Sequence, residues 1–216
     1  MRKTMIAAVA ALAAASLTLT ACSSDDTAST SSSTTSAAAG TSSTAMAASD
    51  GVTKTSDVFG PGCASVPQDP SNKGSLEGMV TDPVATAASN NPLLTKLVAA
   101  VKAANLVDTL NSQASLTVFA PADPAFAELG DAKFAELAAD PAALGKILQY
   151  HVVAKRYDAA GLKAAGTVKS LTNQELKIAG SGDSLTVDGA PVLCGNIPTK
   201  NATVFVIGKV LTPPAA

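Results

Sequence analysis

The middle of the chain carries apolar residues at the spacing of an α-helix. An Asp or Asn before Pro is a typical helix start, because the polar side chain caps free N–H groups and Pro suits the first helical position. Four such pairs predict four helix starts: Asp82-Pro83, Asn91-Pro92, Asp123-Pro124 and Asp140-Pro141. After two of these starts, the apolar residues fall on one face of the predicted helix. They are Leu93, Leu94, Leu97, Val98 and Val101 after Asn91-Pro92, and Leu144, Ile147 and Leu148 after Asp140-Pro141. Phe134 and Leu137 indicate another short helix.

The last third of the chain changes to short β-type runs separated by turn residues. The runs cover residues 167–171, 175–179, 184–187, 191–194 and 203–210, with turns at residues 180–183 and at Asp188-Gly189. One earlier run, residues 116–120, is typical of a buried strand. Helices followed by a β-rich region predict an α+β domain, and about 150 residues are enough for a single core.

The first 22 residues have the pattern of a bacterial lipoprotein signal peptide. Arg2 and Lys3 precede an apolar stretch, residues 5–19, that is short for a membrane-spanning helix. Leu19-Thr20-Ala21-Cys22 resembles a lipobox, in which the Cys receives lipid and becomes the new N-terminus. The alternative is an ordinary signal peptide with a chance Cys. We predict lipidation of Cys22 and a lipid-anchored protein, exported to the outer face of a bacterial cell membrane.

A Ser/Thr-rich segment follows the predicted anchor. Residues 23–49 contain 16 Ser or Thr and no aromatic residue. Such a composition buries too little apolar surface to offset the entropy of ordering. We therefore predict a disordered stalk over residues 23–59, whose glycosylation stays open, and one globular domain over residues 60–216.

Three cysteines are an odd number for an exported protein. If Cys22 carries lipid, Cys63 and Cys194 remain as a pair, and export favours a disulfide between them. The alternatives are two free thiols or a metal site, and two lone Cys without a neighbouring His or Cys are a poor zinc site.

Composition and motifs point away from catalysis and nucleic acid. The net charge is −2 and no basic cluster occurs, whereas phosphate binding needs clustered Lys and Arg. His151 is the single histidine, and no GxSxG motif or glycine-rich phosphate loop accompanies it. Asp123, Glu128, Asp131 and Glu136 could supply paired carboxylates, but short surface helices explain them equally well. We predict no catalytic residue, no metal and no cofactor.

Three segments resemble the fasciclin (FAS1) domain family. Residues 117–126 are similar to the first family segment, Tyr150-His151 lies in an LxYHVV-like run, and residues 203–211 are similar to the closing segment. Their order and spacing also fit over about residues 75–212. Further segments, including Gly60-Pro61-Gly62-Cys63 and Cys194-Gly195, resemble the secreted and lipid-anchored fasciclin antigens of mycobacteria and related actinobacteria. In that subgroup the two cysteines are expected to bond.

The resemblance implies a fasciclin-like fold and an adhesion or recognition role. In animal fasciclin domains a Tyr-His region and an Asp-Ile pair before the last strand are linked to integrin binding. Tyr150 and His151 match the first, while Asn196 and Ile197 stand at the second, so the acid is missing and an integrin-type mode is disfavoured. These four residues are the candidate ligand-binding residues. The alternative is that Tyr150 and His151 are buried elements of the fold.

We therefore expect a cell-surface lipoprotein that recognises an extracellular protein, glycan or lipid, and that is a monomer. Two alternatives remain: a structural or self-associating spacer of the cell envelope, and a cryptic enzyme that uses His151.

Overall fold

A mixed seven-stranded sheet forms the centre of the domain, with strand order β2-β1-β7-β6-β5-β4-β3. The computed structural model describes residues 51–213, so the predicted signal peptide, Cys22 and the stalk up to residue 50 lie outside it. β1 and β7 run parallel, and every other pair of neighbours is antiparallel. The strands are β1 (Leu116–Pro121), β2 (Val152–Val153), β3 (Thr167–Lys169), β4 (Glu175–Ala179), β5 (Thr186–Val187), β6 (Ala190–Pro198) and β7 (Ala202–Ile207).

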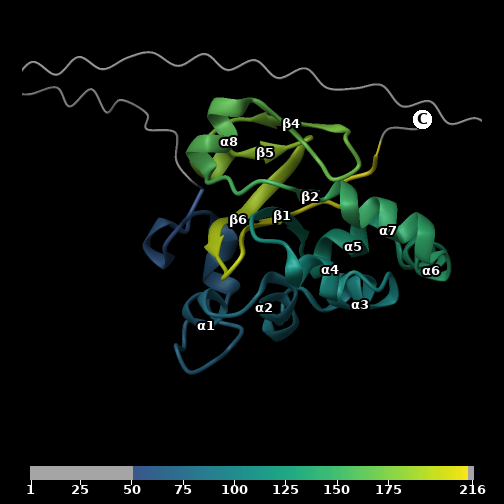
Figure 1. Cartoon of the computed structure of the whole chain (residues 1–216), viewed down its shortest axis with the longest axis horizontal. Coiled ribbons are helices and arrows are strands. Elements are labelled where there is room, and N and C mark those ends of the chain that lie inside the picture. The colour runs from purple at the N-terminus through teal and green to yellow at the C-terminus, as the bar shows by residue number, and fades with distance from the viewer. Residues whose placement is uncertain (1–50, 214–216) are drawn as a thin grey trace, which may run out of the picture. The chain divides into compact units, whose positions relative to one another are not determined.

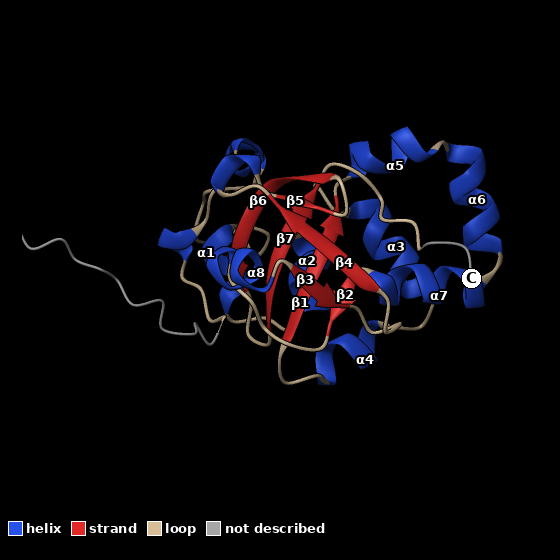
Figure 2. Ribbon diagram, turned by 90° about the horizontal axis from the view of Figure 1, so that it is seen from above, coloured by secondary structure: helices blue, strands red, loops and turns tan. Residues whose placement is uncertain are grey.

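Within the described part of the chain, eight helices surround the sheet. Figure 1 shows α1 to α4 below the central strands and α8, with β4 and β5, above them. In Figure 2, α5, α6 and α7 stand together at one end of the sheet. The helices are α1 (Leu76–Val80), α2 (Val84–Asn90), α3 (Thr95–Ala103), α4 (Val107–Ser112), α5 (Asp123–Leu129), α6 (Asp131–Ala139), α7 (Pro141–Tyr150) and α8 (Ala159–Ala165), with 3-10 turns η1 (Thr55–Asp57), η2 (Pro61–Ser65) and η3 (Gly182–Ser184). This is the predicted α+β arrangement.

The central strands separate two hydrophobic cores. Successive residues of a strand point to opposite faces. In β7, Val204 and Val206 therefore join the core under α1 to α4, the helical core, while Phe205 and Ile207 join the core under α8 and β3 to β5, the β-side core. Every residue of β1 and β7 is buried, as expected for a parallel pair covered on both faces.

Only one of the four predicted Asx-Pro helix starts has the predicted form. Asp140 caps α7 by accepting from the N–H groups of Ala142 and Ala143, with Pro141 in the first turn. Asp123 instead caps α3, because its carboxylate accepts hydrogen bonds from the Thr95 hydroxyl and the Lys96 N–H. α3 starts at Thr95, three residues after Pro92, and α2 starts after Pro83 without a side-chain cap.

Residues 51–59 belong to the domain, so the stalk boundary predicted at residue 59 is wrong. The Thr203 hydroxyl donates to the Gly51 carbonyl at 2.7 Å, and the Asn196 amide donates to the Asp57 carbonyl at 3.1 Å. Both side chains are buried. Buried polar groups need partners within the protein, and this segment supplies them although its own composition is polar.

The same N-terminal segment is tied to β6 in two further ways. Phe59 and Gly195 exchange backbone hydrogen bonds in an isolated bridge, where a Cβ on Gly195 would lie only 2.5 Å from the Phe59 ring. Cys63 of η2 and Cys194 of β6 form a disulfide across 131 residues of sequence. The structure therefore contains the cross-link that cysteine counting favoured.

None of the helices between residues 51 and 213 is long and apolar enough to cross a membrane.

Candidate functional site

Tyr150 is a structural residue of the β-side core. It ends α7, is 1 % exposed, and donates its hydroxyl proton to the Asp188 carboxylate at 3.0 Å. Burial, and then the Asp188 hydrogen bond and charge, raise the pKa of Tyr150 to about 12. The phenol therefore stays protonated and is not offered to a partner on the surface.

His151 is buried with both ring nitrogens engaged. Its Nε2 accepts a hydrogen bond from the Leu211 N–H at 2.9 Å, so the proton lies on Nδ1, which donates to the Ile147 carbonyl at 2.8 Å. Burial lowers the pKa of His151 to about 4, against the weaker opposing effect of the Ile147 hydrogen bond. The imidazole is neutral at physiological pH and has no free nitrogen for acid–base chemistry.

Asn196 and Ile197 are also buried. Asn196 has a φ of 60° in the bulged part of β6, and its side-chain oxygen accepts from the Ala159 N–H at 2.8 Å. Ile197 is 1 % exposed and packs in the helical core. The four candidate ligand-binding residues therefore do not form an exposed binding surface, because burial and internal hydrogen bonds occupy them.

The three family-like segments lie side by side, on β1, on β7 and at the start of the edge strand β2. In the parallel register Thr117 pairs with Thr203 and Phe119 with Phe205, whose rings are 5.8 Å apart. The Phe119 N–H donates to the His151 carbonyl at 2.9 Å. These segments encode the centre of the fold, as the first segment's strand-and-helix pattern suggested.

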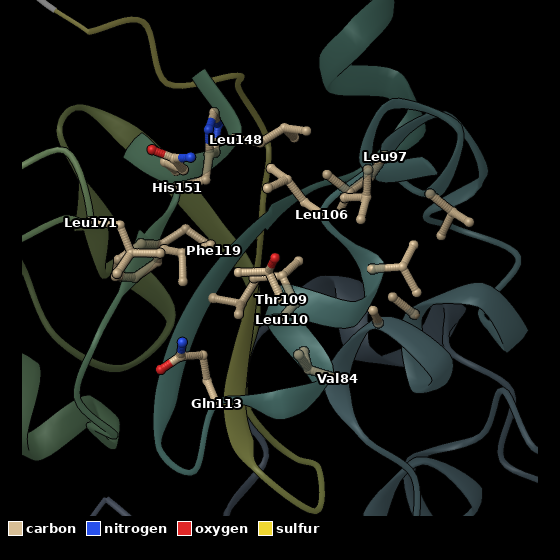
Figure 3. A pocket seen from close by; sticks show the side chains of 18 of the residues that line it. Val84, Leu97, Leu106, Thr109, Leu110, Gln113, Phe119, Leu148, His151 and Leu171 are labelled. Atoms are coloured by element: carbon tan, nitrogen blue, oxygen red, sulfur yellow. The ribbon is translucent and has the colours of Figure 1, made fainter. Parts of the chain in front are cut away.

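A cavity of about 280 Å³ lies in the helical core and is the best-formed site for a ligand. In Figure 3, Val84, Leu97, Leu106 and Leu110 face Phe119, His151 and Leu171 across it. Of the residues that the structure describes, none that lines it carries a formal charge at neutral pH. The full lining is Val84, Ala85, Ala88, Ser89, Leu97, Val98, Val101, Leu106, Val107, Thr109, Leu110, Gln113, Val118, Phe119, Leu148, Gln149, His151, Val152 and Leu171.

Of the predicted site residues between positions 51 and 213, only His151 reaches this cavity, and it contributes a ring whose nitrogens are both occupied. Between residues 51 and 213, no three His, Cys, Asp or Glu side chains gather into a group that could hold a metal ion. Leu97, Val98 and Val101 lie on the apolar helix face that their spacing predicts, but the same stripe would also suit a filled core. No local signal in the sequence separates the two cases.

Comparisons with known proteins agree with this fold. Residues 92–213 match the model of the fasciclin domain family. The chain is 46 % identical over 165 residues to immunogenic protein MPB70 of Mycobacterium bovis, covering 74 % of this chain and 84 % of that protein. It is 44 % identical over 166 residues to cell surface glycolipoprotein MPB83 of the same species, covering 74 % of each.

A solved structure shows the same fold at low identity. The FAS1 domain pair from the insect cell adhesion molecule Fasciclin I aligns with a TM-score of 0.53 at 15 % identity, over 63 % of this chain. The aligned part spans about half, 52 %, of that structure. The chain belongs to the fasciclin domain family.

Proposed function

We propose that this protein is a lipid-anchored cell-surface protein whose fasciclin domain recognises a ligand, in the manner of an adhesion module. The observation that carries the proposal is the 44 % identity to a mycobacterial cell surface glycolipoprotein over most of both chains. The lipobox-like Leu19-Thr20-Ala21-Cys22 and the Ser/Thr-rich residues 23–49 supply an anchor and a tether consistent with such display.

The chemistry of the domain favours binding over catalysis. His151 is locked between two backbone groups, and Asp123, one of the acids considered for a carboxylate pair, caps α3. An apolar cavity with a few polar groups is the usual form of a small-molecule binding site.

Anchoring is tested with the full chain expressed in an actinobacterium. We expect the wild type in the membrane fraction and accessible to an external protease, and we expect Cys22→Ser in the culture medium. Retention of the Cys22→Ser protein on the membrane would contradict the anchor.

Recognition is tested with cells that display the wild type, in adhesion to host cells, extracellular matrix and isolated envelope. An unrelated lipoprotein displayed at the same density is the control. Binding no stronger than that control on any of the three surfaces would contradict the recognition role.

A further inference from the structure

We propose that the cavity in the helical core binds one acyl chain of an uncharged lipid, with the polar head of that lipid at the rim. The inference rests on the proposed function, because it names the ligand class for the recognition that the domain is proposed to perform.

The walls select hydrocarbon over peptide. They are formed by Leu, Val, Ala and Phe side chains together with the ring of His151, whose nitrogens are already bonded. A peptide segment would bring N–H and C=O groups into a space that offers them few partners, and burying such groups unpaired is unfavourable. A hydrocarbon chain carries no such groups.

The volume fits a single medium-length chain. A dry apolar cavity of about 150 Å³ is known to take up benzene, which has six carbon atoms. By that proportion, the 280 Å³ found here accommodates roughly ten to twelve carbon atoms. This is the size of one acyl chain and is too small for the two chains of a diacyl lipid.

The polar residues of the lining are its more exposed ones. Val118, Phe119 and Leu148 are buried, whereas Gln149 is half-buried and Ser89, Thr109 and Gln113 are exposed. Hydroxyl and amide groups both donate and accept hydrogen bonds, so they suit an ester or a hydroxyl head. No cation lines the cavity among the described residues to pair with a carboxylate or a phosphate, which favours an uncharged head.

A buried amide fixes the spacing between α2 and α4, which both line the cavity. The Asn201 side chain donates to the carbonyls of Leu110 and Gln113 at 2.9 and 2.8 Å, and its oxygen accepts from the Val84 N–H at 2.9 Å. The start of α2 and the end of α4 are thus joined by hydrogen bonds, with α4 itself reaching the cavity through Leu110. These hydrogen bonds hold the apolar walls at a fixed separation. Without them, the walls would gain dispersion energy by moving together.

The test uses the full chain with Cys22→Ser, so that no acyl group of its own competes, and 1-dodecanoylglycerol as the probe. We expect saturable one-to-one binding in titration calorimetry and a rise in the unfolding midpoint with probe concentration. Glycerol alone should do neither.

Two matched variants locate the binding. Val98→Trp places a large side chain in the cavity, and we expect it to weaken dodecanoylglycerol binding at least tenfold. Val80→Trp makes the same change at an exposed position of α1 and should bind as the parent protein does. If Val98→Trp fails to fold, Ala88→Leu, at the same cavity, replaces it, and its dodecanoylglycerol binding is compared with that of the parent protein.

Two outcomes overturn the inference: no saturable binding of dodecanoylglycerol, or equal binding by the parent protein and a folded cavity variant. Dodecanoate is expected to bind at least tenfold more weakly, and equal affinity for it would overturn the uncharged-head assignment. The adhesion assay is independent of this titration. Adhesion without lipid binding refutes the inference alone, and lipid binding without adhesion refutes the adhesion role alone.

Discussion

The two cores on either side of β1 and β7 are packed to different degrees. In the β-side core, the buried cluster includes Leu162, Leu176, Leu185, Phe205 and Ile207, none of which lines a cavity among the described residues. In the helical core, equally apolar residues surround a cavity of about 280 Å³, and a second, smaller one of about 20 Å³ lies beside it.

Residue size accounts for the difference. The β-side core is filled by aromatic and large aliphatic side chains that alternate along paired strands. On the helical side, two small residues of α2, Ala85 and Ala88, line the larger cavity, and small side chains leave space that rigid neighbours do not refill. We therefore expect truncations in the β-side core to cost more stability than truncations on the cavity wall.

The largest effect concerns the cross-link that ties the N-terminal segment to the sheet. Replacing Cys63 and Cys194 by Ala should lower the free energy of unfolding by about 5 kcal/mol, because the bond closes a loop of 131 residues. Urea denaturation of the Cys22→Ser chain, with and without the two changes, measures it. A loss below about 1 kcal/mol would show that packing alone holds this segment.

A pair of core truncations compares the two halves directly. Phe205→Ala should cost about 4 kcal/mol, because a filled site cannot close around the void. Leu97→Ala, on the cavity wall, should cost about 2 kcal/mol, since its side chain already faces empty space on one side. Chemical denaturation of both variants gives the difference. Equal losses would remove the distinction between a filled and a hollow core.

A pH titration tests His151, which lies where the two cores meet. Its folded-state pKa of about 4 lies below the ordinary value of about 6.5, so the unfolded chain binds more protons between these values. Stability is complete above pH 6.5 and should fall by about 3 kcal/mol as the pH drops towards 4. His151→Gln is the control, because it removes the titrating group and should flatten this part of the unfolding-versus-pH curve. An unchanged slope in that variant would assign the effect to other groups.

The most local of the predicted effects concerns the contacts between α2 and α4. Asn201→Ala should cost about 2 kcal/mol, because it leaves buried backbone groups of α2 and α4 without partners. Hydrogen exchange should accelerate in α4 and leave the β-side strands unchanged. Asn90→Ala, at an exposed amide, is the matched control. Uniform acceleration over the whole domain would mean that the two halves unfold as one unit.

Local patterns predicted much of the fold. β4 has the predicted bounds, β1 is one residue longer than predicted, and α7 begins at its predicted Asp-Pro cap. β2 was missed, since two residues are too few for a periodic signal. The sequence gives no sign that residues 51–59 belong to the domain, because their contacts come from side chains 139 and 152 positions away.

The sequence by itself determined the α+β class, the family, the pairing of Cys63 with Cys194 as the favoured cross-link, and the expectation of a lipid anchor at Cys22. These depend on short motifs, on periodicity and on residue counts, which are local properties of the chain. Only the tertiary structure decided that Tyr150, His151, Asn196 and Ile197 are buried, and that a cavity lies beside His151. Burial and cavities depend on how well distant surfaces fill the space between them, and no local pattern encodes that fit.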